Sequence, residues 1–287
     1  MKVRKFWITN GNNQTIQFTD GISKIFLNNP TGLGMSNSIT TLNYNEKMNV
    51  ISNVQEFGSI GGEMLFYDYA NKDKYEAYND FITFLSFKPL TFFYQIPSEP
   101  AKTYSIDVDI MSIDKTEVKK DDLLKCDFQL QTLSRWKGEK VTVSGSGSEF
   151  EITNDSHMPV GFEITMTFEN SVVNPSFTLE QDDAVYGIAK FIDQYDTSIV
   201  RPGLVPIHFK SVYVNSNDGE QNVELKNSSS SVLPNPLSYQ DLSVSNGQVY
   251  VTFMKLARGT SILKIYSDDT VQTANVLLEF IPLYRSV

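Results

Sequence analysis

Two histidines, one cysteine and several neighbouring acidic residues are the side chains of this chain whose types and spacing could support chemistry. His157 and His208 lie in different expected segments, and neither has a Cys, His or Glu at the spacing of metal ligands. A zinc site needs three or four ligands. The sequence therefore predicts no metal site, and both histidines are expected to be ordinary surface or strand residues.

Paired carboxylates could support acid–base chemistry, because two of them can run glycoside hydrolysis. The chain has four such pairs, which are Asp107/Asp109, Glu149/Glu151, Asp182–Asp183 and Asp268–Asp269. A chain with 34 acidic residues forms such pairs by chance. Asp107 and Asp109 also alternate with apolar residues, so the solvated face of a strand explains them. A cell-wall hydrolase stays an alternative that zymography would test.

Cys126 and the two tryptophans are expected to be core residues. Cys126 alternates with Leu124 and Phe128, so its side chain should point into a core, where a thiol is unreactive. Trp7 and Trp136 are more often buried than used as ligand contacts.

Two glycine-containing segments could suggest a nucleophile or a phosphate-binding loop. The segment 144–148 reads Ser-Gly-Ser-Gly-Ser and is followed by no helical pattern. Gly32-Leu33-Gly34 does not continue as Gly-x-Gly-x-x-Gly, because Asn37 takes the third glycine position. The sequence therefore predicts no catalytic residue and no cofactor, and we expect a protein that is not an enzyme.

Charge and composition narrow the class of protein further. The formal net charge is -10, and the longest basic run is Lys119–Lys120, which disfavours a nucleic-acid-binding surface. A single cysteine excludes an intrachain disulfide and fits folding in a reducing compartment. The N-terminus has no apolar signal-peptide core, and no apolar run approaches the roughly 20 residues of a membrane helix. We expect a soluble protein, made in a cytoplasm, that does not enter membranes.

Alternation of apolar and polar residues is the dominant pattern along the chain, and it predicts strands with one buried face. It occurs in the segments 104–110, 124–130, 160–168, 249–253 and 274–280.

One segment, 72–87, has helical spacing instead. Its apolar stripe is spaced 3, 4 and 3 residues apart and consists of Tyr75, Tyr78, Ile82 and Leu85. Phe81 and Phe84 widen this stripe, so the helix should lie deeply against a sheet. Asn71 is the expected N-cap, and Pro89 bars the helix from continuing.

The expected domain boundary is the segment 144–148, whose Gly/Ser composition is typical of a flexible connector. The alternative is a hairpin turn inside one domain, because Gly/Ser clusters mark turns as readily as linkers. With the connector, the chain consists of an α+β domain over residues 1–143 and a nearly all-β sandwich over residues 144–287.

A series of short motifs in the first half resembles the distal tail proteins of siphophages. The motifs, in order, are Phe6–Gly11, Ile22–Asn28, Gly32-Leu33-Gly34, Gly61–Phe66, Tyr75–Leu85, Leu90–Tyr94, Tyr104–Val108, Ile113–Glu117 and Leu133-Ser134-Arg135-Trp136. In that family a Gly-Leu-Gly turn precedes a strand, a helix carries a Tyr-x-x-Tyr/Phe stripe, and a Lys-x-Glu element precedes a Leu-Ser-x-Trp-like ending. The shared order carries this resemblance.

The second half resembles the galectin-like domain of the same family more loosely. Asn174-Pro175 looks like a strand start of that domain, and Tyr239–Leu242, Val249–Phe253 and Leu256–Ile265 look like its closing strands. The resemblance implies a mainly β fold with some α, in which a split-barrel-like, ring-forming belt domain is followed by a galectin-like β-sandwich.

The resemblance also implies a function, which is that of a structural component of the phage tail tip or baseplate. The implied assembly is a homo-hexameric ring that links the major tail tube protein to the tail-associated lysin or hub protein. Its second domain would hold receptor-binding or other baseplate proteins, and DNA would only pass through the channel. Such a protein is made and assembled in the host bacterial cytoplasm and ends in the virion tail tip.

Two other functions stay open. A related baseplate or tube protein is disfavoured by the galectin-like second half, which a minimal tube subunit would lack. A carbohydrate-binding host-adhesion module would be revealed by glycan binding to the second half, because a galectin-like fold does not fix function.

Overall fold

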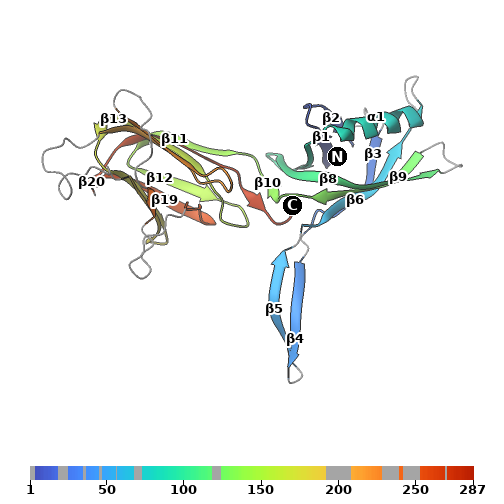
Figure 1. The fold of residues 1–287 in the computed structure, drawn as a ribbon, viewed down its shortest axis with the longest axis horizontal. Helices are drawn as coiled ribbons and strands as arrows, with labels where there is room; N and C mark the ends of the chain where they lie inside the picture. The colour runs from blue at the N-terminus through green and yellow to red at the C-terminus, as the bar shows by residue number, and fades with distance from the viewer. Residues whose placement is uncertain are drawn as a thin grey trace. The chain divides into compact units, whose positions relative to one another are not determined.

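The structure is a computed structural model that describes residues 4–18, 25–34, 37–44, 47–55, 57–67, 73–117, 124–191, 208–227, 239–241, 253–268 and 270–287. The chain forms two compact units (Figure 1). The first unit contains Met1–Glu139 together with Tyr284–Val287, and the second contains Lys140–Leu283. The mainly β fold with some α that the sequence predicts is confirmed.

The first unit is built on one sheet of nine described strands. Its strands are β1 (Lys5–Thr9), β2 (Thr15–Gln17), β3 (Ile25–Thr31), β6 (Ser59–Phe66), β7 (Leu90–Ile96), β8 (Lys102–Glu117), β9 (Leu124–Thr132), β10 (Trp136–Lys137) and β22 (Leu283–Tyr284). The main hydrogen-bonded order is β2-β1-β7-β8-β9-β6-β3, and β10 pairs with both β8 and β22. Among the described residues this order ends at β2 and β3, and the backbone N–H of Leu27 in β3 donates to the carbonyl oxygen of Phe18, just after β2, at 3.3 Å.

The alternating patterns in the first unit are confirmed as strands with one buried face. In β9 the buried residues are Leu124, Cys126, Phe128, Leu130 and Thr132, and the residues between them are partly or fully exposed. In β8 the alternation buries Ile106 and Val108. These side chains form one core with those of β6 and β7.

The helix α1 (Lys74–Ser86) covers this core with a face that agrees only in part with the predicted stripe (Figure 1). Its buried residues are Ala77, Phe81, Phe84 and Leu85. Tyr75 and Ile82, which the stripe prediction placed inside, are each 39% exposed. The prediction was right for Leu85, Phe81 and Phe84 and wrong for Tyr75 and Ile82, because apolar residues occur on most of the helix surface and spacing alone does not set the edges of the buried face.

The two ends of α1 follow ordinary capping chemistry. Asp73 is the N-cap, and its carboxylate accepts a hydrogen bond of 2.7 Å from the backbone N–H of Glu76. The predicted N-cap, Asn71, lies outside the described residues, and the cap is two positions later. The helix ends at Ser86, before Pro89, as the proline predicts.

The second unit is a sandwich of two antiparallel sheets. The five-stranded sheet has the order β11 (Val141–Gly147), β21 (Ala274–Phe280), β13 (Glu163–Val172), β16 (Phe209–Asn215) and β17 (Asn222–Asn227). The six-stranded sheet has the order β12 (Glu149–Asn154), β19 (Gly259–Ser267), β14 (Pro175–Gln181), β15 (Ala184–Phe191) and β18 (Tyr239–Asp241), and β20 (Thr270–Val271) pairs with β19. Both sheets contribute to one buried core.

The alternating patterns of the second unit are confirmed in part. All five predicted residues from Val160 to Phe168 are buried, and so are the four predicted positions of β21. In the 249–253 segment, only Phe253 lies among the described residues, and it packs against the core outside any strand.

The Gly/Ser segment 144–148 is not the flexible connector that its composition predicts. Residues 144–147 lie in β11 and pair with Leu277 to Ala274 of β21. After Ser148 the chain continues in β12, which pairs with β19 in the other sheet. The segment therefore carries the chain between the two sheets inside the second unit, and the division between the units falls at Glu139 and Lys140. In the part of the chain that the structure describes, no helix has the length and apolar character to span a membrane.

Phe81 tests which face of α1 holds the first unit together. It is fully buried, with ring centroids 5.8 Å from Phe66, 5.9 Å from Phe128 and 6.1 Å from Phe18. Phe81→Ala should lower the free energy of unfolding by about 3–5 kcal/mol, because it removes a buried ring and leaves a cavity. Ile82→Ala, on the exposed face, should lower it by less than about 1 kcal/mol.

Both tryptophans lie in the first unit, so urea unfolding followed by tryptophan fluorescence reports on this unit. Equal losses for the two variants would contradict the observed helix face.

Candidate assembly surfaces

The first acidic pair that could suggest catalysis, Asp107/Asp109, forms ion pairs with lysines. Asp107 forms an ion pair of 2.6 Å with Lys137, and Asp109 forms one with Lys88. The hydrogen bonds from Lys88 and from the backbone N–H of Ile110 hold the pKa of Asp109 below its usual range. These acids are therefore paired members of a strand's outer face.

The other acidic pairs lie in β12 and in turns. Glu149 and Glu151 are exposed in β12. Asp182 and Asp183 form the turn between β14 and β15, where both have positive φ values, of 52° and 60°. Asp268 also has a positive φ, and its carboxylate accepts a hydrogen bond of 2.8 Å from Asn174, next to the predicted strand start at Pro175.

The remaining candidate residues are brought into no common site. His157 and His208 lie in loops of the second unit, and Nδ1 of His208 is 3.5 Å from the carbonyl oxygen of Ser171. Cys126 is fully buried, as predicted, and burial raises the pKa of its thiol to about 11. No group of three or more His, Cys, Asp or Glu side chains that could hold a metal ion occurs among the described residues.

The two tryptophans differ in environment. Trp136 is 3% exposed and belongs to the core of the first unit, as predicted. Trp7 is partly exposed on the other face of the sheet, where it stacks on Phe93 with 5.2 Å between ring centroids.

Several of the short sequence motifs contact one another inside the first unit. The ammonium group of Lys115 lies 4.6 Å from the ring centroid of Tyr75 and 5.8 Å from that of Tyr78, so the Lys-x-Glu element holds the Tyr-x-x-Tyr helix by cation–π contacts. Asn10 is buried and joins the β1–β2 turn to the end of α1. Its amide donates to the carbonyl oxygen of Phe84 at 3.1 Å, and its side-chain oxygen accepts from the backbone N–H of Gln14 at 3.0 Å.

The sequence analysis did not predict a hairpin of two long strands, which offers a further surface for assembly. The strands β4 (Asn37–Tyr44) and β5 (Lys47–Gln55) pair with each other in a two-stranded sheet of their own (Figure 1). The hairpin has little alternation, which is why the dominant pattern did not reveal it. The signal that could have found it is two runs with β-branched residues around the two-residue Asn45-Glu46 connection.

The root of this hairpin is fixed to β9 by backbone carbonyls. The Thr132 backbone N–H and hydroxyl both donate to the carbonyl oxygen of Gly58, at 3.0 and 2.7 Å. The Gln131 amide donates to the carbonyl oxygens of Phe57 and Gly58, at 3.2 and 3.1 Å. These hydrogen bonds therefore fix the position of Phe57 and Gly58, where the chain leaves the hairpin.

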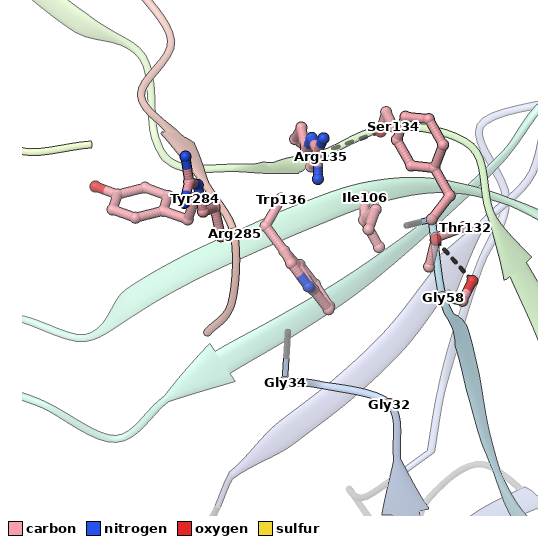
Figure 2. A pocket seen from close by; sticks show the side chains of 11 residues that line it. Gly32, Gly34, Gly58, Ile106, Thr132, Ser134, Arg135, Trp136, Tyr284 and Arg285 are labelled. Atoms are coloured by element: carbon pink, nitrogen blue, oxygen red, sulfur yellow. Dashed lines mark hydrogen bonds between the residues drawn. The ribbon is translucent and has the colours of Figure 1, made fainter. Parts of the chain in front are cut away.

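A small pocket lies at the same root and is lined from five separate parts of the first unit (Figure 2). Its walls include Gly32, Gly58, Arg135, Trp136, Tyr284 and Arg285. Residues 284–287 also contribute elsewhere, since the ring of Tyr284 meets that of Tyr104 edge-on at 5.2 Å and the backbone N–H of Val287 donates to Leu33. The free volume is about 30 Å³, which is room for two or three waters and too little for a sugar or nucleotide.

A second hollow runs beside the edge strand β2. It has a volume of about 370 Å³ and lies between β2 and the C-terminal half of α1. Its apolar walls are Ile16, Phe84 and Phe87, and Asp80 is the charged residue among those that line it. Phe87 is 42% exposed. An edge strand beside an apolar hollow suits the docking of another strand.

The described part of the first unit is thus one sheet covered by one helix, with the hairpin β4–β5 as a separate two-stranded sheet. Residues 5–133 match the family described as distal tail protein, N-terminal domain. This part of the chain is thus similar to the N-terminal domain of distal tail proteins. The resemblance stated from the sequence motifs is confirmed. Comparison with curated proteins finds no match.

Solved structures agree with this fold along the whole chain. The crystal structure of SPP1 Dit (gp 19.1), described as a hub of the adsorption apparatus in phages infecting Gram-positive bacteria, matches with a TM-score of 0.64 and 10% identity, over 96% of this chain and 98% of that one. A chain of the phage P2 baseplate in its activated conformation with Ca matches with a TM-score of 0.52 and 11% identity, over 99% and 100%. At these identities the likeness shows the fold alone.

Gly32 is the turn residue whose replacement should disturb the hairpin root. Its φ is +80°, and a Cβ there would lie 1.8 Å from the carbonyl oxygen of Ser59, whereas a Cβ at Gly34 would meet nothing within 4 Å. Gly32→Ala should therefore lower the free energy of unfolding of the first unit by about 3 kcal/mol. Gly34→Ala, the matched control, should change it by less than about 1 kcal/mol. Urea unfolding followed by tryptophan fluorescence gives both values, and a stable Gly32→Ala protein would refute the described turn.

Proposed function

We propose that this protein forms a homo-hexameric ring through its first unit and links the tail tube to the tail-tip lysin or hub protein. The observation that carries the proposal is a match to the distal tail protein N-terminal domain in which, among the described residues, β4 and β5 pair only with each other. Hairpins of two strands are marginally stable alone in water and need a third strand or a packed surface. A neighbouring copy supplies that surface in a ring.

The two edges of the main sheet differ in what they can accept. Edge β3 contains Pro30, which lacks a backbone N–H, and its register with β6 shifts between Asn28 and Thr31. Edge β2 has no such feature and lies beside the apolar hollow at Phe87. The hairpin of one copy therefore adds to the β2 edge of the next. Such a contact joins two different patches, which is the kind of interface that closes a ring.

The second unit holds receptor-binding or other baseplate proteins in this proposal, as a galectin-like sandwich. Its exposed large apolar side chains supply contacts for such partners, and they are Val185, Tyr186, Val271, Leu277 and Ile281. The described hub role of SPP1 Dit in an adsorption apparatus supports this part. The ring is assembled in the host cytoplasm, has no catalytic role, and leaves the cell in the virion tail.

The sheet face opposite α1 lines the DNA channel in this proposal. On that face three acids stand next to one another across the strands, because Asp114 pairs with Asp127, and Asp127 pairs with Glu63. Asp114 and Asp127 are exposed, and Glu63 has Lys125 at 3.4 Å as a partner. Negative charge on a channel wall repels phosphates and keeps passing DNA from binding.

Removal of the hairpin tests the ring. Gly34 and Phe57 line the same pocket, so a short Gly/Ser turn can replace residues 36–56 without stretching the sheet. Light scattering of the purified full chain should give a mass about six times that of one chain, and the hairpin-deleted chain should be monomeric. Its tryptophan-detected unfolding midpoint should stay unchanged, because the hairpin has its own sheet. A full chain that stays monomeric at high concentration, or a deleted chain that still assembles, would contradict the proposal.

Charge reversal tests the channel face. Asp114→Lys with Asp127→Lys should slow DNA ejection from assembled particles about tenfold or more at low salt, because each lysine adds a phosphate contact. The slowing should shrink as salt is raised. Glu149→Lys with Glu151→Lys, on exposed positions of the second unit, is the matched control and should leave ejection unchanged. If the variant with Asp114→Lys and Asp127→Lys ejects DNA at the wild-type rate, this face of the sheet does not line the channel.

A further inference from the structure

The strand β11 is an edge of the second unit that lacks the usual protection of edge strands. Among the described residues it pairs only with β21, from Val141 to Gly147 and without a register shift. Its sequence, Val-Thr-Val-Ser-Gly-Ser-Gly, contains no charge and no proline. The other ends of the two sheets are β12, β17 and β18, and each of them carries a charged residue. Since charges, prolines and bulges keep edge strands from pairing further, β11 is the edge that can accept another strand.

Small residues in β11 leave larger side chains beside them uncovered. On the outer face, Ser144 stands opposite Leu277, which is 43% exposed. On the inner face, a Cβ on Gly145 or Gly147 would lie 3.4 or 3.5 Å from the ring of Phe150, so this partly buried ring lies directly beside the two glycines. A large apolar side chain opposite Gly145 in an added strand would cover the ring, as an aromatic residue does when it stands opposite an edge glycine.

The charges beside this edge decide what kind of strand fits it. Glu163 of β13 stands directly opposite Glu279 of β21 on the outer face, where like charges repel each other. Lys140 lies 2.6 Å from Glu279, and the hydroxyl of Thr142 in β11 donates to the same carboxylate at 3.2 Å. Glu163 accepts from the hydroxyl of Tyr213, a neutral group, at 3.2 Å. A residue opposite Thr142 in an added strand would be two strand spacings, about 10 Å, from Glu279, which an arginine side chain can span.

The charge of the second unit as a whole favours the same kind of strand. Residues 140–283 contain 17 acidic and eight basic residues, which gives a net charge of -9 out of the -10 of the chain. Two copies of this unit repel each other, so a second β11 is a poor partner for the first. A basic segment is attracted instead, and this attraction raises its rate of association.

We propose that β11 binds an extended, basic segment of another protein, which adds to the five-stranded sheet as an antiparallel strand. This surface is how the second unit would hold its partner, so the proposal rests on the proposed function of that unit. Antiparallel pairing continues the pattern of the whole sheet. The bound segment has a basic residue opposite Thr142, an apolar residue opposite Ser144 and an aromatic residue opposite Gly145. Main-chain hydrogen bonds supply the affinity, and these three side chains supply the selectivity.

A capped peptide with this pattern tests the surface on the full chain. The peptide Val-Thr-Phe-Val-Thr-Arg-Val, aligned antiparallel to β11, puts its Arg opposite Thr142, its central Val opposite Ser144 and its Phe opposite Gly145. With a fluorescein label on a Gly-Ser spacer, it should bind saturably in a fluorescence anisotropy titration. Replacement of its Arg by Glu should weaken binding about tenfold or more at low salt. A peptide that does not bind saturably, or a Glu peptide that binds equally well, overturns the proposal.

Backbone methylation separates strand addition from non-specific attraction. In an added antiparallel strand, the N–H groups of alternate residues face β11 and those between them face solvent. Two further peptides, each N-methylated on one of these alternating sets, should therefore differ in affinity by about tenfold or more. Equal affinities of the two methylated peptides overturn the proposal.

Charge variants of the chain test where the peptide lies. Glu163→Gln with Glu279→Gln should weaken binding of the Arg peptide about fivefold or more, and should not weaken binding of the Glu peptide. Glu149→Gln with Glu151→Gln, at exposed positions of β12 in the other sheet, removes the same charge and should change binding less than about twofold. Circular dichroism melts verify that both double variants are folded. Equal losses in the two double variants overturn the proposal.

The peptide assay separates this surface from the ring, because it reads one edge of each copy. If the full chain stays monomeric and binds the peptide with the expected selectivity, the ring fails and the β11 surface stands. If the chain forms rings and the rings do not bind the peptide, β11 is closed to other proteins or covered by a second copy. The proposal for β11 is then overturned while the ring stands.

Discussion

The need of backbone N–H and C=O groups for hydrogen-bond partners is the constraint on which this protein depends. Inside the first unit, nine strands satisfy one another, and α1 protects the face that carries Phe66 and Phe128. Among the described residues, the order of this sheet ends at β2 and β3, and β4 and β5 pair only with each other. Pro30 and a register shift interrupt β3, whereas β2 has no such feature. In the proposed ring, the hairpin and the β2 edge supply each other with partners.

The packing beneath the sheet explains why these edges can be left open. Phe81 lies among three rings from β6, β9 and the segment after β2, and Lys115 holds the start of the helix by its contacts with Tyr75 and Tyr78. Asn10 ties the opposite end of the helix to the β1–β2 turn. These contacts fix the β1–β2 turn against the helix, and in the proposed ring a docked strand would meet a preformed surface, which lowers the entropy lost on association.

Sequence patterns predicted those parts of the fold in which one face is buried and the other is not. Alternation in β9, β13 and β21 follows directly from such burial, so these strands could be read from residue types. The buried face of α1 could be predicted only in part, because Tyr75 and Ile82 are apolar enough for a core and yet are each 39% exposed. The segment 144–147 has the composition of a linker, but its pairing with β21 decides its structure. The pocket was invisible because its residues lie more than 200 positions apart and only the fold unites them.

The return of residues 284–287 to the first unit makes the second unit an insertion within the first rather than an appendage after it. The strands β10 and β22, which flank the inserted residues on either side, are paired with each other. A host domain keeps its own fold when an inserted domain begins and ends at neighbouring points of its surface. The second unit is thus interchangeable in principle. A different sandwich, or a short turn, could be spliced between residues 139 and 284 while the first unit keeps its fold, and in the proposed ring this exchange would alter what the tail carries without rebuilding the ring.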